Sequence, residues 1–458
     1  MSEDTNPYLD TISLMEETML VGSGGKLIGS GPSKERVSTL FVPEEPRTFA
    51  DLGLSPTFVE HLCIKQIMAM PGSSGRDVAK ALCLNPSLVL PVLSNLKRRM
   101  LVVHATAEVS GADFHFELSE AGRSFAQDIR KLSPYVGPAP VTLDAYEASV
   151  ALQSLSEENI GPVNLKKAFS DLVVDAELLS LLGPAMASGR GVFLFGNSGN
   201  GKTSLAMRMS GAYRHRVYIP HAIMMEGQII QLYDPQVHVA VEGHGDNEDP
   251  FRERLDSRWI LCERPTVIAG GELTLASLEL QEDKETGVSE APLQLKANCG
   301  LMVVDDFGRQ QIDPAALLNR WILPLENRVD FLKLPNGRKV RVPFDPFLVF
   351  STNLDPSDLV DEAFLRRIPY KVEVPDPSLG MFRKLLRREA SAMGFQDDET
   401  AVSYLIRTVY TQPGRAMRCC HPRDLLLQIK NRCLYMGQPL QMTSEGIDLA
   451  AKGYFTLL

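Results

Sequence analysis

The stretch Gly191–Ser210, GVFLFGNSGNGKTSLAMRMS, constrains the fold of this chain more than any other. A short apolar run ends in a glycine-rich loop, and the loop leads into residues typical of a helix. The loop Gly196–Thr203 matches the pattern G-x-x-x-x-G-K-[ST] in full. Its glycines let successive backbone N–H groups point into one concavity, and the N-terminus of the next helix adds a positive dipole. The stretch therefore predicts a strand, a phosphate-binding loop and a helix. A glycine-rich loop arising by chance is disfavoured because the flanking strand and helix patterns are both present.

Two side chains of this loop have specific roles in phosphate chemistry. We expect Lys202 to reach the β and γ phosphates of a nucleotide and the Thr203 hydroxyl to ligate Mg²⁺. The residues predicted to bind the nucleotide in this loop are Gly196, Asn197, Ser198, Gly199, Asn200, Gly201, Lys202, Thr203 and Ser204.

The composition limits the class of protein. The chain has 458 residues, a net charge of −10 and 44% hydrophobic residues, which favour a soluble multidomain protein and argue against one dominated by nucleic-acid contacts. No apolar run reaches the ~18 residues of a membrane span. The acidic start predicts no signal peptide, and seven cysteines without a C-x-x-C pair are typical of a reducing cytoplasm, which is the expected location.

Changes in pattern predict five segments. The second of them has three helices followed by two strands and a closing helix, which is the order of a winged helix. The predicted segments are a flexible arm at 1–45, with one short helix near Leu9–Leu20, a winged-helix domain at 46–132, a linker with a short helix at 133–165, an α/β nucleotide-binding domain at 166–376 and a helical lid domain at 377–458.

Five strongly apolar strands, GVFLF, RVYIP, LMVVDD, FLVFSTN and YKVEV, alternate with helices in the α/β segment. Such runs predict a parallel sheet covered on both faces. About 80 residues separate the second of these strands from the third. The insertion at 221–298 contains a Gly-Gly turn, which predicts either a hairpin or an inserted helix. The sequence at 328–344 predicts a second hairpin, which turns at Pro335–Asn336–Gly337.

Acidic and amide side chains end two of these strands. In LMVVDDF, Asp305 is expected to hold Mg²⁺, and Asp306 to orient or deprotonate the attacking water. In FLVFSTN, Asn353 is a candidate for positioning that water, because we expect its strand to lie between the phosphate-loop strand and the LMVVDD strand. The simpler alternatives are a core strand that runs into a turn and a Thr-Asn pair that caps the next turn.

Three arginines further along the chain are candidates for phosphate contacts. Arg366 and Arg367 precede the last strand and either lie on a solvated helix end or reach the nucleotide of a neighbouring subunit. Arg423 follows a proline in the first turn of a helix, where the helix dipole disfavours a cation. A nearby phosphate would explain that position.

The set GNSGNGKT, LMVVDDF, FLVFSTN, FLRRI and HPRDL, in this order and followed by helices, resembles the AAA+ ATPases over about two-thirds of the chain. The resemblance implies a ring, usually a homo-hexamer, which binds ATP with Mg²⁺ between subunits and hydrolyses it. It also implies that Asn353 is sensor 1, that Arg366 or Arg367 is an arginine finger in trans, and that Arg423 is sensor 2. The insertions resemble those of the MoxR and magnesium-chelatase branch.

The second acid departs from the family pattern. Asp306 stands where a Glu is usual, so its carboxylate is expected ~1.5 Å further from the γ-phosphate, an error that can cost ~100-fold in rate. We therefore expect slow hydrolysis, and a switch that does not hydrolyse ATP is a third class of function.

The expected winged helix leaves two kinds of partner open. Its third helix would present Ser87, Leu88, Val89, Pro91 and Ser94 to a DNA groove, with no Arg, Asn or Gln at the reading end. Between residues 46 and 132, ten Lys and Arg stand against eight Asp and Glu. These features favour an unknown protein partner, which the ATPase would remodel or assemble. The alternative is a DNA-associated regulator or loader.

Overall fold

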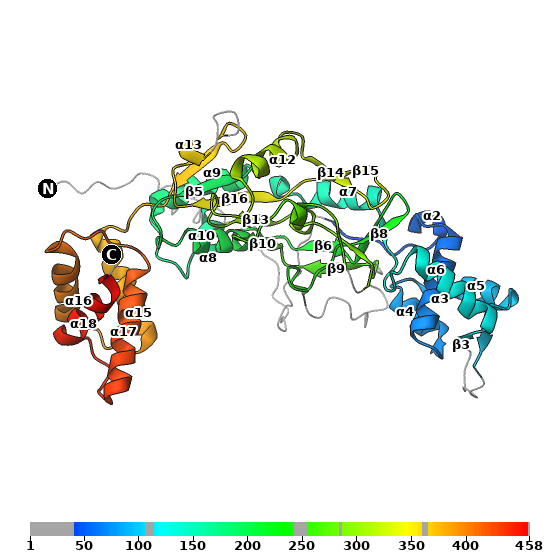
Figure 1. Cartoon of the computed structure of the whole chain (residues 1–458), viewed down its shortest axis with the longest axis horizontal. Helices are drawn as coiled ribbons and strands as arrows, with labels where there is room; N and C mark the ends of the chain where they lie inside the picture. The colour runs from blue at the N-terminus through cyan, green and yellow to red at the C-terminus, as the bar shows by residue number, and fades with distance from the viewer. Residues whose placement is uncertain (1–40, 106–113, 242–254, 284–285, 360–364, 457–458) are drawn as a thin grey trace, which may run out of the picture. The chain divides into compact units, whose positions relative to one another are not determined.

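A parallel sheet forms the core of the nucleotide-binding segment in the computed structural model, which describes residues 41–105, 114–241, 255–283, 286–359 and 365–456. Every neighbouring pair of its strands is parallel (Figure 1). The expected α/β sheet is therefore confirmed, with the strand order β10 (Thr266–Ala269), β13 (Leu301–Val304), β16 (Phe347–Thr352), β5 (Val192–Phe195) and β17 (Tyr370–Glu373).

The three central strands β13, β16 and β5 are buried on both faces, which is why they are almost entirely apolar, whereas the edge strands β10 and β17 are partly exposed. Val192 and Leu194 point to one core, and Phe193 between them points to the other. Helices α8 (Pro162–Ala168), α9 (Ala176–Ala187) and α10 (Lys202–Met209) supply the first core, and α12 (Pro314–Asn327) supplies the second.

The prediction that RVYIP belongs to this parallel sheet was wrong. RVYIP forms β6 (Val217–Pro220), which pairs antiparallel with β9 (Trp259–Cys262) in a separate two-stranded sheet. The sheet position next to β13 belongs to β10, within the region expected to be an insertion. Both runs are short, apolar and buried, and periodicity alone cannot tell which of two such runs joins a given sheet.

A second five-stranded sheet unites the insertion with the segment expected to be a linker. The first strand of the linker segment pairs with a strand of the insertion, and α7 (Leu143–Gln153) and the 3₁₀ turn η1 (Leu155–Glu157) follow it. The order of this sheet is β11 (Gln281–Glu282), β12 (Ser289–Glu290), β8 (Gln228–Gln231), β7 (Ala222–Met225) and β4 (Val141–Thr142). Shorter elements elsewhere in the nucleotide-binding segment are η2 (Ser210–Ala212), η3 (Ala276–Leu278), α11 (Leu293–Lys296) and α13 (Pro356–Leu359).

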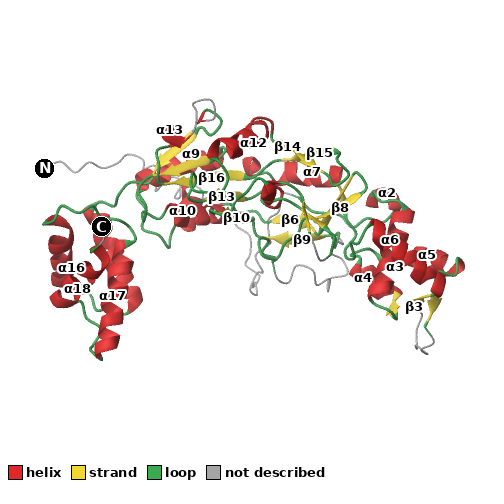
Figure 2. Cartoon of the chain, viewed as in Figure 1, coloured by secondary structure: helices red, strands yellow, loops and turns green. Residues whose placement is uncertain are grey.

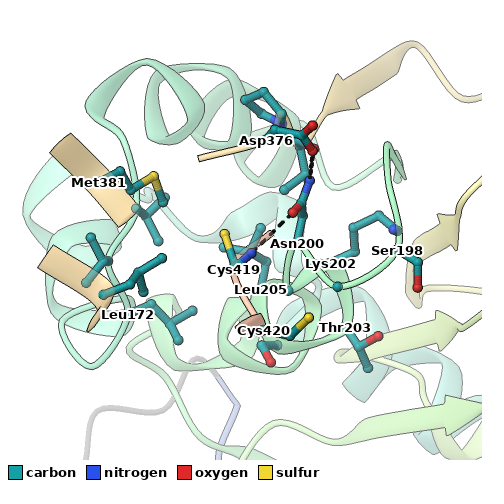
Figure 3. Close-up of a pocket in the computed structure, with 18 of the residues that line it drawn as sticks. Leu172, Ser198, Asn200, Lys202, Thr203, Leu205, Asp376, Met381, Cys419 and Cys420 are labelled. Carbon is teal, nitrogen blue, oxygen red and sulfur yellow. Dashed lines mark hydrogen bonds between the residues drawn. The ribbon is translucent and has the colours of Figure 1, made fainter. Parts of the chain in front are cut away.

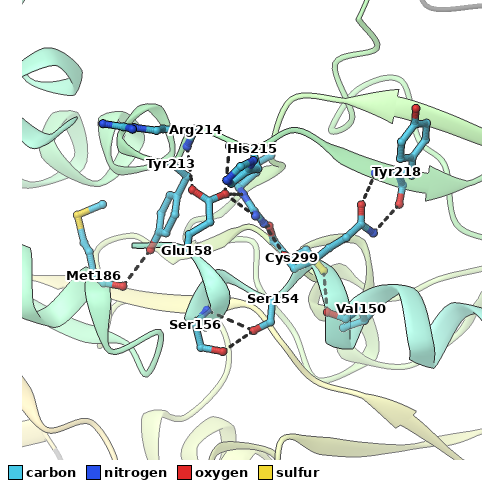
Figure 4. A network of polar contacts seen from close by, with 12 residues as sticks. Val150, Ser154, Ser156, Glu158, Met186, Tyr213, Arg214, His215, Tyr218 and Cys299 are labelled. Carbon is cyan, nitrogen blue, oxygen red and sulfur yellow. Dashed lines mark hydrogen bonds and ion pairs between the residues drawn. The ribbon is translucent and has the colours of Figure 1, made fainter. Parts of the chain in front are cut away.

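A buried ion pair fastens these segments together just before β10. Arg264 donates to Glu158 at 2.6 and 2.9 Å, and Glu158 also accepts from the backbone N–H groups of Arg214 and His215 at 2.8 and 3.1 Å (Figure 4). Both members of the pair are buried. Removing one partner of such a pair leaves an uncompensated charge, so this contact holds the start of β10 in place.

The expected hairpin after the second acid is confirmed. β14 (Val329–Lys333) and β15 (Lys339–Pro343) pair antiparallel, and Pro335, Asn336 and Gly337 lie in the turn between them.

Helices and a small antiparallel sheet make up residues 46–132. Asn85 caps the third main helix, because its Oδ1 accepts from the Ser87 N–H at 2.9 Å. The sheet order is β1-β3-β2. The elements are α2 (Phe49–Leu52), α3 (Pro56–Ala69), β1 (Ser73–Ser74), α4 (Gly75–Ala81), α5 (Pro86–Arg98), β2 (Val102–His104), β3 (His115–Leu118) and α6 (Glu120–Leu132).

The exposed face of α5 differs from the expected one. Leu88 and Val89 are buried in the core, whereas Leu90 and Pro91 are exposed beside Ser94. The same core includes Ala222 and Ile229 of the second sheet and Val288, which directly precedes β12. The expected helix near Leu9–Leu20 lies outside the described residues.

The C-terminal helices enclose a core of their own (Figure 2). They are α15 (Leu379–Met393), α16 (Glu399–Leu405), the π-helix η4 (Ile406–Thr411), α17 (His421–Met436) and α18 (Ser444–Phe455). In the described part of the chain, no helix combines the length and the apolar character that crossing a bilayer requires.

A buried histidine makes the stability of these helices depend on pH. Burial, and then the charge of Arg418, lower the pKa of His421 to about 4 from 6.5. Because the unfolded chain binds the proton more readily between these values, the free energy of unfolding should fall as the pH drops from 6.5 towards 4. We expect a loss on the order of 1 kcal/mol at pH 5, which allows for the partial solvent access of the ring.

The measurement is the thermal midpoint of the full chain at pH 7 and pH 5. His421→Gln should narrow the difference between the two midpoints. The same substitution at His104 should narrow it less, because burial lowers the pKa of His104 less strongly than that of His421. If the wild type and both variants show the same difference in thermal midpoint between pH 7 and pH 5, His421 is not the source of the pH dependence.

Candidate nucleotide-binding site

The glycine-rich loop connects β5 to α10 and has the backbone conformation that its sequence predicts. Gly196, Gly199 and Gly201 have φ values of 131°, 84° and 82°, a region that other residues rarely adopt. A Cβ on Gly196 would lie 2.5 Å from the carbonyl oxygen of Val374. Helix α10 then begins at Lys202 with no side-chain cap, so its first N–H groups face the loop.

Lys202 connects the loop to the end of β16. Its Nζ donates to the carbonyl oxygens of Gly196 and Asn197 at 2.8 and 3.0 Å, and to Asn353 Oδ1 at 2.6 Å. Burial lowers its pKa, and the neighbouring Asp306 and Asp305 oppose that shift. The predicted phosphate-binding lysine therefore lies beside the predicted water-positioning asparagine.

Thr203 and Asp305 meet where a metal ligand pair was expected. The Thr203 hydroxyl donates to the two carboxylate oxygens of Asp305 at 2.8 and 2.9 Å. Among the described residues no group of three or more His, Cys, Asp or Glu could hold a metal. One hydroxyl and one carboxylate nevertheless fit Mg²⁺, which binds through few protein oxygens and keeps waters and phosphate oxygens as its other ligands.

Asp306 is held in an unusual backbone conformation. Its φ is 49°, a left-handed value that Asp tolerates better than most residues. The side chain is exposed, and its Oδ1 accepts from Asn353 Nδ2 at 3.3 Å. Such strain is common at functional sites. The structure thus brings both acids and Asn353 to one edge of the sheet.

The three arginines separate into two groups. Arg423 is exposed and lines the same pocket as the loop. Arg367 bonds Glu326 of α12 at 2.8 Å, and neither it nor the exposed Arg366 lines this pocket. The two candidate fingers are therefore not brought to the site of their own chain.

Sequence reasoning missed Asp376, which holds the loop through hydrogen bonds with two of its asparagines. Its Oδ1 accepts from Asn200 Nδ2 at 2.8 Å and from Asn197 Nδ2 at 3.2 Å, and it also pairs with Arg418 (Figure 3 shows the bond to Asn200). Burial opposes ionisation of Asp376, but hydrogen bonds from Asn200, Arg418 and Asn197 outweigh it and lower its pKa. No motif spacing singles out Asp376. Its only signal is its place just after the last strand.

The C-terminal helices contact the loop through their backbone as well. Cys420 N–H donates to the Gly199 carbonyl at 2.9 Å, and Cys419 N–H to Asn200 Oδ1 at 3.4 Å. A Cβ on Gly199 would lie 2.6 Å from Cys420 Sγ, and the φ of 84° also favours glycine at this position.

A cavity of about 470 Å³ lies over the loop, a volume in the range of small-ligand sites. Apolar side chains such as Leu172, Leu178 and Met381 line it together with the loop. In Figure 3, Leu172 and Met381 lie on one side and Ser198, Lys202 and Thr203 on the other. The pocket therefore offers an apolar surface for a base and a polar cradle for phosphates.

Comparison with known proteins gives a limited result. A family model described as a domain of unknown function, DUF8689, matches residues 378–453. None of the curated proteins matches the sequence. Among solved structures, the chain is similar to the RuvB Holliday junction branch migration motor of Thermotoga maritima, at 12% identity and a TM-score of 0.35, over 65% of this chain and 71% of that one. It is also similar to NtrX from Brucella abortus, at 13% identity and a TM-score of 0.34, over 69% and 58%. Likenesses this weak carry no argument about the chain, whose site is defined by its own residues.

Proposed function

We propose that this protein is an AAA+ ATPase that binds ATP with Mg²⁺ and hydrolyses it to ADP and phosphate. One observation carries the proposal: Lys202, Thr203, Asp305 and Asn353 converge, within hydrogen-bond distance of their partners, at the mouth of one pocket.

Each of these residues has a role in the proposed reaction. Lys202 exchanges its contacts with loop carbonyls for phosphate oxygens, and the loop N–H groups hold the phosphates. Thr203 and Asp305 hold Mg²⁺, which neutralises developing charge on the phosphates. Asp306 accepts a proton from the attacking water, and Asn353, bonded to it, orients that water. Arg423 acts as sensor 2 from the first turn of α17.

The base role of Asp306 is the direct test of this mechanism. Asp306→Asn should lower the rate of ATP hydrolysis about 100-fold and leave ATP affinity unchanged, because Asn keeps the shape and tolerates the left-handed backbone but cannot accept the proton. The measurements are steady-state phosphate release and ATP binding by the full chain. Equal turnover would contradict the base role. Binding without turnover in the wild type would favour a non-hydrolysing switch.

We also propose a ring, a homo-hexamer as in the resembled family, in which Arg366 or Arg367 acts on the nucleotide of the next subunit. Arg366→Ala combined with Arg367→Ala should abolish turnover and spare ATP binding. Phosphate release measured across a dilution series would check this, since wild-type activity per chain should fall as subunits separate. Full activity of monomers would contradict an arginine finger in trans.

For the biological role, we propose remodelling or assembly of a protein partner in the cytoplasm, with residues 46–132 as a winged-helix recruiting domain. The described exposed side chains of α5 support this partner class, because Leu90, Pro91 and Ser94 are poor readers of base edges. The MoxR and magnesium-chelatase branch is the finer proposal, supported by the hairpin of β14 and β15.

The second candidate is a DNA-associated regulator or loader. The exposed Lys97, Arg98 and Arg99 at the end of α5 favour it, because they could contact phosphates. Binding of the full chain to duplex DNA at two salt concentrations separates the two candidates. Affinity that falls steeply with salt supports the DNA role, and no binding at low salt excludes it.

A further inference from the structure

The outward face of the hairpin formed by β14 and β15 is cationic. Alternate side chains point inward, and these are Asp330, Leu332, Val340 and Val342, all buried. Between them Phe331, Lys333, Lys339 and Arg341 are exposed, and Phe331 is 43% exposed.

The pairing of the two strands places like charges side by side on this face, which destabilises the hairpin unless an anionic partner binds there. Lys333 stands directly opposite Lys339, and like charges in that position destabilise a sheet. The one acid of these strands, Asp330, is buried and bonds Arg320 at 2.6 Å. Within the described residues, Lys333, Lys339 and Arg341 form no ion pair, although the whole chain carries a net charge of −10. The face is therefore complementary to an anionic ligand.

The same side chains form one wall of a groove. Lys333, Lys339 and Phe331 line a hollow of about 970 Å³ together with Leu323 of α12 and Glu282 of β11. Its other charged lining residues, Glu279, Asp330 and Arg320, pair with one another, which leaves the two lysines and Glu282 as its unpaired charges among the described residues. Leu323 and Phe331 are each 43% exposed, so the groove offers apolar surface as well as cations. β14 packs beside α12 (Figure 1).

The combination of cationic and apolar surface in the groove distinguishes between two kinds of anionic polymer, a nucleic acid and an acidic polypeptide. A phosphate backbone in the groove would leave the apolar surface of Phe331 and Leu323 unused. An extended polypeptide can place carboxylates and apolar side chains alternately. We propose that this groove binds an extended segment of the partner protein, with carboxylates against Lys333 and Lys339 and an apolar side chain against Phe331 and Leu323. The inference rests on the proposed function and names the chemistry of its substrate.

The test uses the full chain and a fluorescent peptide that alternates Glu and Leu with Gly and Ser, and binding is followed by anisotropy. Lys333→Glu combined with Lys339→Glu should weaken binding at least about tenfold, because like charges would then face each other in the groove. The matched control combines Lys166→Glu with Lys167→Glu on α8, where both lysines are exposed, and should bind like the wild type.

Two results would overturn the inference: equal weakening in both double variants, or stronger binding of the matched peptide in which Lys replaces Glu. Displacement of the peptide by single-stranded DNA at lower concentration than by unlabelled peptide would favour a nucleic acid instead. ATP binding is measured on the same proteins. If the wild-type protein binds ATP but no peptide, the result contradicts only the proposed peptide groove. If it binds no ATP, the result contradicts the proposed function.

Discussion

Replacing Lys202 by Met is expected to weaken ATP binding about 100-fold and to abolish hydrolysis. The Lys202 amino group is the buried cation that reaches from the loop to Asn353. A hydrogen bond to a charged group contributes about 1.5–3 kcal/mol, so two contacts with phosphates account for about 3 kcal/mol, or about 100-fold in affinity. Met preserves the length and apolar stem of Lys, and the helix should form as before.

Isothermal titration with ATP and Mg²⁺ and steady-state phosphate release measure the two effects. The matched control is Arg208→Met on the same helix, where the side chain bonds Asp171 at the surface. That variant should bind and hydrolyse ATP like the wild type, because exposed ion pairs contribute little. Wild-type affinity in Lys202→Met would remove the basis of the proposed phosphate site.

The second large effect is expected at Asp376, which lines the pocket and positions the loop through Asn197 and Asn200. Asp376→Ala should weaken ATP binding about tenfold and lower the thermal midpoint. The substitution leaves the donors on Asn197, Asn200 and Arg418 without their shared acceptor, and each unmade bond to a part-buried group costs about 1–3 kcal/mol. The loop then loses its link to Arg418 and keeps only its contacts with the backbone N–H groups of Cys419 and Cys420.

A purely structural role can be separated from positioning by conservative change. Asp376→Asn keeps an acceptor for Asn200 but removes the charge that faces Arg418, so it should recover part of the ATP affinity. The rate of hydrolysis at saturating ATP should change less than the affinity in both variants. Asp355→Ala is the control, since this exposed residue bonds only Ser357. Equal affinity in Asp376→Ala and the wild type would show that the loop holds its shape alone.

Much of the fold was predictable because its signals are local. The phosphate loop, the hairpin and the cap at Asn85 each depend on residues within a few positions of one another. The second strand of the parallel sheet was not, because β6 and β10 have the same apolar pattern. A contact between distant residues lies directly before β10, the buried bond between Arg264 and Glu158, 106 positions apart, and such contacts leave no local signal.

By itself the sequence determined the cradle and the chemistry beside it: GNSGNGKT after one apolar strand, Asp305 at the end of another and Asn353 after a third. Parallel strands bring their carboxyl ends to one edge, so these local patterns were enough to predict that they meet. Only the tertiary structure decided how the loop is held, since Asp376 and Asn200 are 176 positions apart. The left-handed φ of Asp306 and the exposed cationic face of the hairpin also depend on the tertiary structure alone. These features depend on packing and pairing between distant segments, which no local pattern records.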